Sequence, residues 1–186
     1  MHAAPQRDKG RLVALLFDLG DTLMVEEREV KDADGTTVSA ELIPGAADML
    51  HALAQRGQRL ALTADSRPLT PPNVLRQHGL LGLFEYLAIS EVVGVSKPHP
   101  LMFTTVLDAL GIARAQYGSV AMVGNSLERD IAGANRLGLV SVFFHWNERR
   151  RSQPMTEDEQ PDYTVHSMRE LHDLIERLDE SHSQAG

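Results

Sequence analysis

The chain has 186 residues, a length that fits one domain. Its 42% of hydrophobic and 24% of charged residues are typical of a soluble globular protein. The net charge of -8 argues against a nucleic-acid-binding surface over the whole molecule, because phosphate backbones attract cationic faces. The only compact basic cluster is Arg149-Arg150-Arg151, which we interpret as a solvated loop.

The chain contains no cysteine, which excludes disulfides, thiolate zinc sites and cysteine nucleophiles. No segment approaches the roughly 20 apolar residues that a membrane span needs. The apolar run at residues 12–17 is too short for the hydrophobic region of a signal peptide. We therefore expect a cytoplasmic protein that does not enter a membrane.

Residues 12–17 form a continuous apolar run, which is typical of a strand buried on both faces. Further along the chain, apolar stripes at helical spacing alternate with short apolar runs. In order, these are a helix around Ala46, Leu50 and Leu53, strands at 59–63 and 86–89, a helix around Met102, Val106 and Leu110, a strand at 119–123, a helix around Leu127, Ile131 and Ala134, a strand at 139–144 and a helix around Leu171, Leu174, Ile175 and Leu178.

This alternation predicts an α/β protein, a three-layer αβα Rossmann-like fold with a parallel sheet of five strands or slightly more. We expect a single domain over residues 11–181, with loose ends at residues 1–10 and 181–186. In such open sheets, ligands bind outside the carboxyl ends of the strands. The residues that directly follow each apolar run are therefore the candidates for a functional site.

The first two runs end in FDLGDTL and LALTADS. In the first motif, Asp18 closes a buried strand, so that its carboxylate is either exposed at the sheet edge or an acidic turn residue. In the second, the Thr63 hydroxyl and the backbone N–H groups that follow it can cradle an anion. Each signal is weak alone.

Two further motifs, GVSKPHPLMF and VGNSLERDIAGA, come later in the chain. Lys97 lies in a loop, and Pro98 can start the next helix. Gly124 permits a tight turn at a strand end, and Asn125 and Asp130 offer the oxygen ligands that magnesium favours. The order of all four motifs, each after a strand, strengthens the case for one shared site.

Together the four motifs resemble the haloacid dehalogenase-like hydrolase superfamily, over roughly residues 12–144. The resemblance implies a phosphoric monoester hydrolase in which Asp18 attacks phosphorus and forms an aspartyl-phosphate. It implies that Thr63 hydrogen-bonds the transferring phosphoryl group and that Lys97 neutralises the nucleophile and the phosphate. The implied cofactor is Mg²⁺, and its implied ligands are Asp18, the backbone carbonyl of Gly20, Asn125 and Asp130.

The sequence departs from this family at two positions. Gly20 stands where the family's phosphatases usually carry a second aspartate, the acid for the leaving group and then the base for water. Such help is worth about 10²–10⁴-fold, and Asp21, one place later, either replaces it or is a turn residue. Asn125 replaces the first aspartate of the acidic motif, which removes a negative charge and predicts weaker magnesium binding.

Residues 24–42 are polar and acidic, and Asp34-Gly35 is a hairpin turn signal. They predict a small flap of two strands in place of a full cap domain. We expect an open site that accepts a phosphorylated small molecule or a larger substrate, or that a second subunit closes. Four residues are expected at the substrate rim, with plain packing as the alternative role: Ala64, Arg67, His145 and Trp146.

Two other functions remain open at this point. A carbon–halogen hydrolase would use the same aspartate without a metal and without the second aspartate. The missing cap weighs against it, because a small haloacid needs enclosure. A binding module that has lost catalysis would keep only the phosphate or metal site.

Overall fold

The computed structural model describes residues 11–180. At its centre is a six-stranded sheet in the order β5-β4-β1-β6-β7-β8, and every neighbouring pair is parallel. The strands are β1 (Ala14–Phe17), β4 (Leu60–Ala64), β5 (Phe84–Ile89), β6 (Val120–Gly124), β7 (Val140–Phe144) and β8 (Tyr163–Val165). The five predicted strands are confirmed, and β8 is an addition at the sheet edge.

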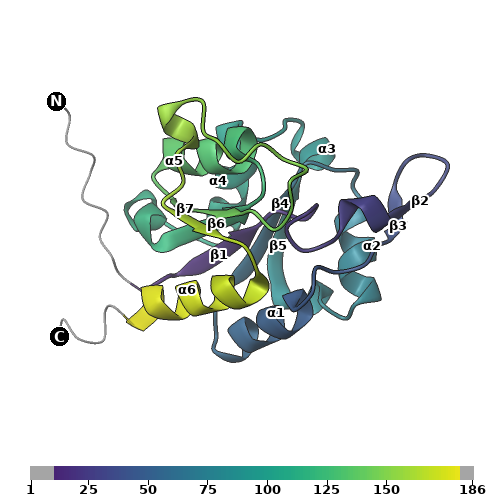
Figure 1. The fold of residues 1–186 in the computed structure, drawn as a ribbon, viewed down its shortest axis with the longest axis horizontal. Coiled ribbons are helices and arrows are strands. Elements are labelled where there is room, and N and C mark those ends of the chain that lie inside the picture. Colours follow the sequence, from purple (N-terminus) through teal and green to yellow (C-terminus); the bar gives the residue numbers. More distant parts are fainter. Residues whose placement is uncertain (1–10, 181–186) are drawn as a thin grey trace.

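Within residues 11–180, six α-helices accompany the sheet: α1 (Ala46–Gln55), α2 (Thr70–Gln77), α3 (Ser90–Val93), α4 (Pro100–Ala109), α5 (Ala132–Leu137) and α6 (Met168–Glu180). A π-helical turn, Leu127–Ile131, leads into α5. Helices α1 and α6 cover one face of the sheet, and α4 and α5 cover the other (Figure 1). The predicted three-layer αβα fold is therefore confirmed.

The alternation of side chains along β1 explains why both faces are covered. Leu15 and Phe17 pack in the core beneath α1 and α6, whereas Ala14 and Leu16 pack in the core beneath α4. All four are fully buried, because successive side chains of a strand point to opposite faces. A continuous apolar run is thus the pattern that a central strand of this sheet requires.

The predicted flap is a short antiparallel hairpin of β2 (Val30–Lys31) and β3 (Thr37–Ser39). It turns at Gly35, whose φ of 80° is in the left-handed region that favours glycine. The backbone N–H of Thr37 donates to the Thr70 hydroxyl at 3.0 Å, and Asn73 donates to the Thr37 carbonyl at 3.0 Å. These bonds fasten the hairpin to α2, beyond the carboxyl end of β1 (Figure 1).

Within residues 11–180, no helix combines the length and the apolar character that crossing a membrane requires. The loose ends predicted at 1–10 and 181–186 lie outside the described residues, as does the last residue of the predicted domain. The single-domain boundaries stay a prediction.

Candidate active site

A cavity of about 530 Å³ opens at the carboxyl ends of β1 and β4. Its walls come from the residues after these two strands, from the β2–β3 flap and from the loop before α4. Its lining residues include Asp18, Gly20, Glu26, Glu29, Lys31, Ala64, Asp65, Ser66, Arg67 and Glu91. The sheet thus brings segments far apart in the sequence to one edge, as the position of ligands in open α/β sheets predicts.

Asp18 is held at the wall of this cavity by neighbours on three sides. Its backbone N–H donates to the Val123 carbonyl at 2.9 Å, which ties the end of β1 to β6. The Thr22 hydroxyl donates to Oδ2 at 3.2 Å, and the Lys97 ammonium lies 2.7 Å from Oδ1. The carboxylate is therefore oriented before any ligand binds.

Lys97 is the cation at the centre of the site, and its side chain is only 1% exposed. Besides Asp18, its Nζ lies 2.7 Å from Asp130 Oδ1 and donates to the Thr63 carbonyl at 2.9 Å. Burial alone would lower the pKa of this ammonium, but the charges of Asp130, Asp18 and Asp65 outweigh burial and raise its pKa above the usual range. Lys97 therefore stays positively charged.

Asp130 lies against the end of β6, where Gly124 leaves room for it. A Cβ on Gly124 would overlap the Asp130 carboxylate, so only glycine fits at this position. The backbone N–H of Ser126 donates to Oδ2 at 3.0 Å, while Oδ1 faces Lys97. Burial raises the pKa of the Asp130 carboxyl to about 6, against the opposing effect of the Lys97 ammonium.

Asp65, which the sequence reasoning missed, fixes the loop that carries Lys97. Its Oδ1 accepts the backbone N–H of Lys97 at 2.9 Å, and its Oδ2 lies 3.4 Å from Arg129. Asp65 directly follows β4, so the rule that selected the residues after each strand could also have selected it. It acts on Lys97 through the backbone.

The residues present fit a magnesium ion. Both amide atoms of Asn125 are buried and have no hydrogen-bond partner among the described residues, so its amide oxygen is available to coordinate a cation. Asn125 follows β6, the strand beside Asp18, so a carboxylate and an amide oxygen lie at adjacent strand ends. Gly20 lines the cavity. Both oxygens of Asp130 are already engaged, so its expected contribution is through Lys97 or a water.

The Thr63 hydroxyl does not line the cavity, contrary to the expectation for this residue. Thr63 is fully buried, and its hydroxyl donates to the Met102 carbonyl of α4 at 3.4 Å. Because side chains alternate along β4, Thr63 shares the α4 face with Ala61. The next three residues, Ala64, Asp65 and Ser66, line the cavity instead.

Asp21 is turned away from the cavity and is not among its lining residues. Its φ of 49° is left-handed, and it is 1% exposed. Oδ1 accepts the backbone N–H of Glu26 at 3.1 Å, and Oδ2 lies 2.9 Å from Arg149. Of the two roles considered for Asp21, turn residue or replacement acid, the structure supports the turn residue, because both carboxylate oxygens are engaged.

The sequence predicted that the basic run after β7 is a solvated loop. In the structure, all three arginines of this run instead form ion pairs. Arg149 pairs with Asp21, and Arg150 lies 3.3 Å from Glu26 Oε2. Arg151 pairs with Glu159 at 2.8 Å. The loop is thus fastened to the segment that follows β1.

Two of the expected rim residues line the cavity and two do not. Ala64 and Arg67 lie on its wall. His145 instead stacks on Phe143, with ring centroids 5.4 Å apart, and its backbone N–H donates to Val165. Trp146 packs against the larger core cluster. Both residues therefore pack against the protein interior and do not line the cavity. Strand β8 pairs with β7, and the chain directly after β7 is hydrogen-bonded to β8.

The model of the haloacid dehalogenase-like hydrolase family matches residues 34–138. The chain belongs to this family. It is 30% identical to the glyceraldehyde 3-phosphate phosphatase of Methanopyrus kandleri over 73% of this chain and 57% of the relative. It is 34% identical to the pyrimidine 5'-nucleotidase YjjG of Escherichia coli over 72% of this chain and 56% of that protein. The chain spans about half the length of the curated relatives it matches.

Solved structures of the family share the fold. A phosphatase from Thermococcus onnurineus has a TM-score of 0.70 at 19% identity, over 87% of this chain and 97% of that one. YfnB of Bacillus subtilis, solved bound to magnesium, has a TM-score of 0.72 at 19% identity, over 89% and 99%. The L-2-haloacid dehalogenase of Xanthobacter autotrophicus has a TM-score of 0.70 at 15% identity, over 89% and 98%. Likeness at this level of identity establishes the fold alone.

Within this haloacid dehalogenase-like site, Glu26 is a second residue that sequence reasoning missed. It lines the cavity, and its carboxyl lies beside Gly20. Burial raises the pKa of the Glu26 carboxyl, the neighbouring charge of Asp21 adds to the rise, and Arg150 opposes it. No pattern in the sequence marks it, because contact with Gly20 depends on the turn at Asp21.

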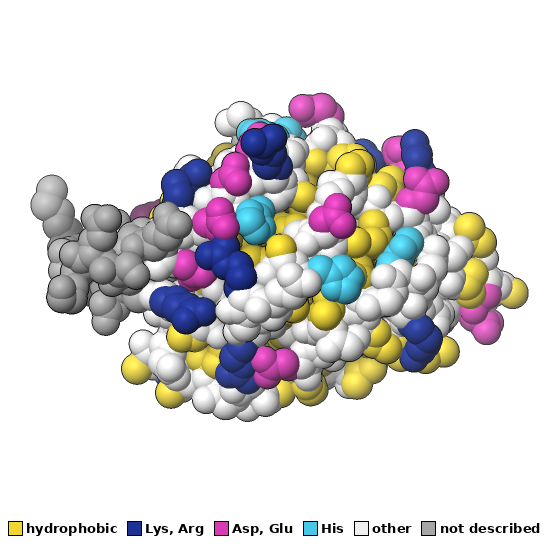
Figure 2. All heavy atoms as spheres, turned by 90° about the horizontal axis from the view of Figure 1, so that it is seen from below, with side chains coloured by type: hydrophobic (Ala, Val, Ile, Leu, Met, Phe, Trp, Pro, Cys, Tyr) yellow, Lys and Arg dark blue, Asp and Glu magenta, His cyan; other side chains and the backbone are white. Residues whose placement is uncertain are grey.

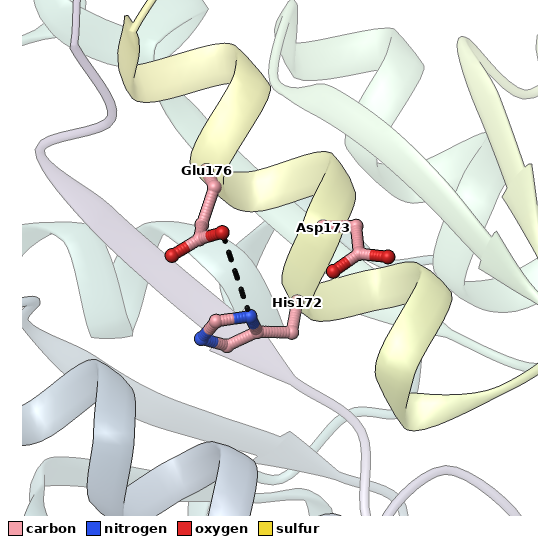
Figure 3. A group of neighbouring side chains, drawn as sticks. All are labelled: His172, Asp173 and Glu176. Atoms are coloured by element: carbon pink, nitrogen blue, oxygen red, sulfur yellow. Dashed lines mark ion pairs between the residues drawn. The ribbon is translucent and has the colours of Figure 1, made fainter.

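A second hollow, of about 410 Å³, lies between residues 44–52 and 167–172, in the layer formed by α1 and α6. Figure 2 shows this face, where apolar side chains lie exposed between charged side chains and histidines. On α6, His172, Asp173 and Glu176 can bring one ligand atom each within 4.8 Å (Figure 3). Glu176 already forms an ion pair with Arg56, so its negative charge is compensated by a guanidinium and needs no metal ion.

Proposed function

We propose that this chain is a magnesium-dependent phosphoric monoester hydrolase in which Asp18 is the nucleophile and forms an aspartyl-phosphate. The observation that carries the proposal is the buried Lys97 ammonium, which lies 2.7 Å from Asp130 and 2.7 Å from Asp18, a residue on the wall of the cavity. A nucleophilic carboxylate held against a permanent buried cation is suited to attack on an anionic ester.

Charge is the main obstacle to this reaction. Two unit charges about 4 Å apart repel by roughly 4 kcal/mol at an effective dielectric constant of 20, and a phosphate monoester carries close to two charges. Lys97 supplies one compensating cation. Magnesium held by Asp18, Asn125 and the Gly20 carbonyl would supply further positive charge at the phosphate.

The protein's own groups then have a limited task. An Asp18 oxygen forms a bond to phosphorus while the bond from phosphorus to the leaving oxygen breaks. Lys97 and the Thr22 hydroxyl hold the carboxylate in place through 2.7 and 3.2 Å contacts. Water later breaks the aspartyl-phosphate. Phosphoryl transfer depends mainly on such positioning and on charge stabilisation.

The proposed substrates are phosphorylated small molecules. Relatives are named for glyceraldehyde 3-phosphate, pyrimidine nucleotides and phosphoserine. The cavity of about 530 Å³ is in the range of small-molecule sites, and Lys31 and Arg67 on its wall can face further anionic groups. The absence of cysteine fits a reducing compartment, and we propose the cytoplasm as its location.

The test uses an aryl phosphate, whose leaving group is good enough to need no acid. We expect turnover with Mg²⁺, loss of turnover in EDTA and a loss of at least about 10³-fold in Asp18→Asn. The exposed Asp48, on α1, provides the control Asp48→Asn, which should match the unaltered protein. Halide release from a haloacid without metal would favour a dehalogenase. Magnesium binding without turnover of any phosphate would favour a binding module.

A further inference from the structure

The carboxyl group of Glu26 occupies the space that a side chain at position 20 would use. A Cβ built on Gly20 would lie 2.9 Å from both Cγ and Cδ of Glu26, and closer still to Oε1. Gly20 is two residues from Asp18, and all three residues line the same cavity. Glu26 therefore presents a carboxyl group beside Gly20, in the cavity that Asp18 also lines, from a segment six residues further along the chain.

The other carboxylates around Asp18 are poorly placed for the same task. Asp65 is engaged by the Lys97 backbone and by Arg129. Glu29 accepts the Thr37 hydroxyl at 2.7 Å and pairs with Lys31 at 2.6 Å, on the flap. Glu91 is exposed on α3.

Glu26 is positioned by two arginines. Arg150 lies 3.4 Å from its Oε1 and 3.3 Å from its Oε2, and Arg149 lies 3.5 Å from Oε2. Its side chain is 27% exposed, so that it is shielded but reaches the solvent of the cavity. Its shortest ion pair, 3.3 Å, is longer than the 2.9 Å hydrogen bond that engages Asp65, and the Glu26 carboxyl can therefore exchange a proton with a bound ester.

We propose that Glu26 is the general acid and base of the hydrolysis, a role that rests on the proposed function of Asp18. In the first step, the Asp18–phosphorus bond forms, the bond to the leaving oxygen breaks, and the Glu26 carboxyl gives its proton to that oxygen. In the second step, water attacks phosphorus, its proton passes to the Glu26 carboxylate, and the Asp18–phosphorus bond breaks. Inorganic phosphate leaves and both residues return to their starting state.

The competing role for Glu26 is purely structural, as an anchor for Arg149 and Arg150. Dependence on the leaving group separates the two roles, because an alkoxide needs a proton far more than an aryl oxide does. We would measure kcat/KM with Mg²⁺ for p-nitrophenyl phosphate and for glycerol phosphate, in the unaltered chain, in Glu26→Gln and in Glu27→Gln. Glu27 is the matched control, since its side chain is 68% exposed and also lies 3.5 Å from Arg149.

For Glu26→Gln we expect a loss of about 10²-fold or more on glycerol phosphate and less than about tenfold on the aryl ester. Glu27→Gln should match the unaltered chain on both. An equal loss on both esters, or no loss, in Glu26→Gln would overturn the role of Glu26 while leaving Asp18-dependent aryl turnover, and hence the proposed function, intact. Absence of Asp18-dependent turnover on the aryl ester would defeat both proposals.

A second pair of variants tests whether a side chain at position 20 and the Glu26 carboxyl compete for the same space. This test does not depend on the Glu26→Gln variant. Gly20→Asp alone should be impaired, because its side chain overlaps Glu26. Gly20→Asp combined with Glu26→Ala should exceed Glu26→Ala by at least about tenfold on glycerol phosphate, with circular dichroism as the check of folding. A folded double variant that is no faster than Glu26→Ala would count against the proposal.

Discussion

Lys97 and Asp18 lie 79 positions apart in the chain, yet the ammonium and the carboxylate are 2.7 Å apart and almost excluded from solvent. The same ammonium lies 2.7 Å from Asp130. One cation thus holds together the ends of β1 and β6, and its removal would leave two carboxylates facing each other.

Lys97→Met should therefore destabilise the fold as well as stop turnover. Breaking a buried pair by removing one partner typically costs about 3–5 kcal/mol, because an uncompensated charge stays buried. Urea unfolding at pH 7 measures the change. Lys31→Met is the control, since the Lys31 side chain is 51% exposed and its pairing with Glu29 should contribute less than about 1 kcal/mol. A loss of less than about 1 kcal/mol in Lys97→Met would contradict the role assigned to this pair.

Asn125→Asp should strengthen magnesium binding. The substitution restores a negative charge beside Asp18, and we expect the Kd for Mg²⁺ to fall at least about tenfold, or about 1.4 kcal/mol. In EDTA the added charge should repel Asp18, so the melting temperature should fall without metal and recover with it. Titration calorimetry and thermal melts measure both effects. An unchanged Kd would mean that Asn125 does not contact the ion.

Gly124→Ala should lower both stability and activity. A methyl group at this position overlaps the Asp130 carboxylate, and overpacking of this kind costs about 1–3 kcal/mol. Gly82→Ala is the matched control, because a Cβ on Gly82 meets no atom within 4 Å. Thermal melts of the two variants give the comparison. Equal melting temperatures would show that Asp130 does not need to lie against the end of β6.

Glu159 should make the fold sensitive to acid. The hydrogen bond from Arg151, helped by the Met155 backbone N–H, lowers the pKa of the Glu159 carboxyl from 4.5 to about 2. A lowered pKa in the folded state contributes stability above pH 4.5 that is lost as the pH falls from there toward 2. Glu159→Gln should flatten the stability curve across that range in urea unfolding. A variant curve parallel to that of the unaltered chain would exclude this contribution.

Much of the fold is readable from the sequence, because a strand buried on both faces must be a continuous apolar run. The polar residues that end such runs then converge at one sheet edge, which is why Asp18 and Asn125 could be selected from the runs. Lys97 and Asp130 lie further along their loops, and the family resemblance was needed to assign their roles. Strand β8, by contrast, has only three residues, including the polar Thr164, and it carries no such signal.

The orientation of individual side chains was harder to predict. Whether Thr63 faces the cavity or α4 depends on the face that its position in β4 assigns to it. Whether Asp21 or Glu26 reaches the cavity depends on one left-handed turn, which is set by tertiary contacts to Arg149 and Arg150. A single sequence carries no periodic pattern for contacts of this kind.

The proposed mechanism requires that Asp18 becomes phosphorylated during turnover, and acid quenching would trap that aspartyl-phosphate. The chain would be mixed with p-nitrophenyl phosphate and Mg²⁺, quenched during steady turnover, digested and mapped by mass spectrometry. We predict one added phosphoryl group on the peptide that contains Asp18, absent from Asp18→Asn. Steady turnover without any phosphoryl group on that peptide, together with undiminished activity of Asp18→Asn, would show that Asp18 is not the nucleophile.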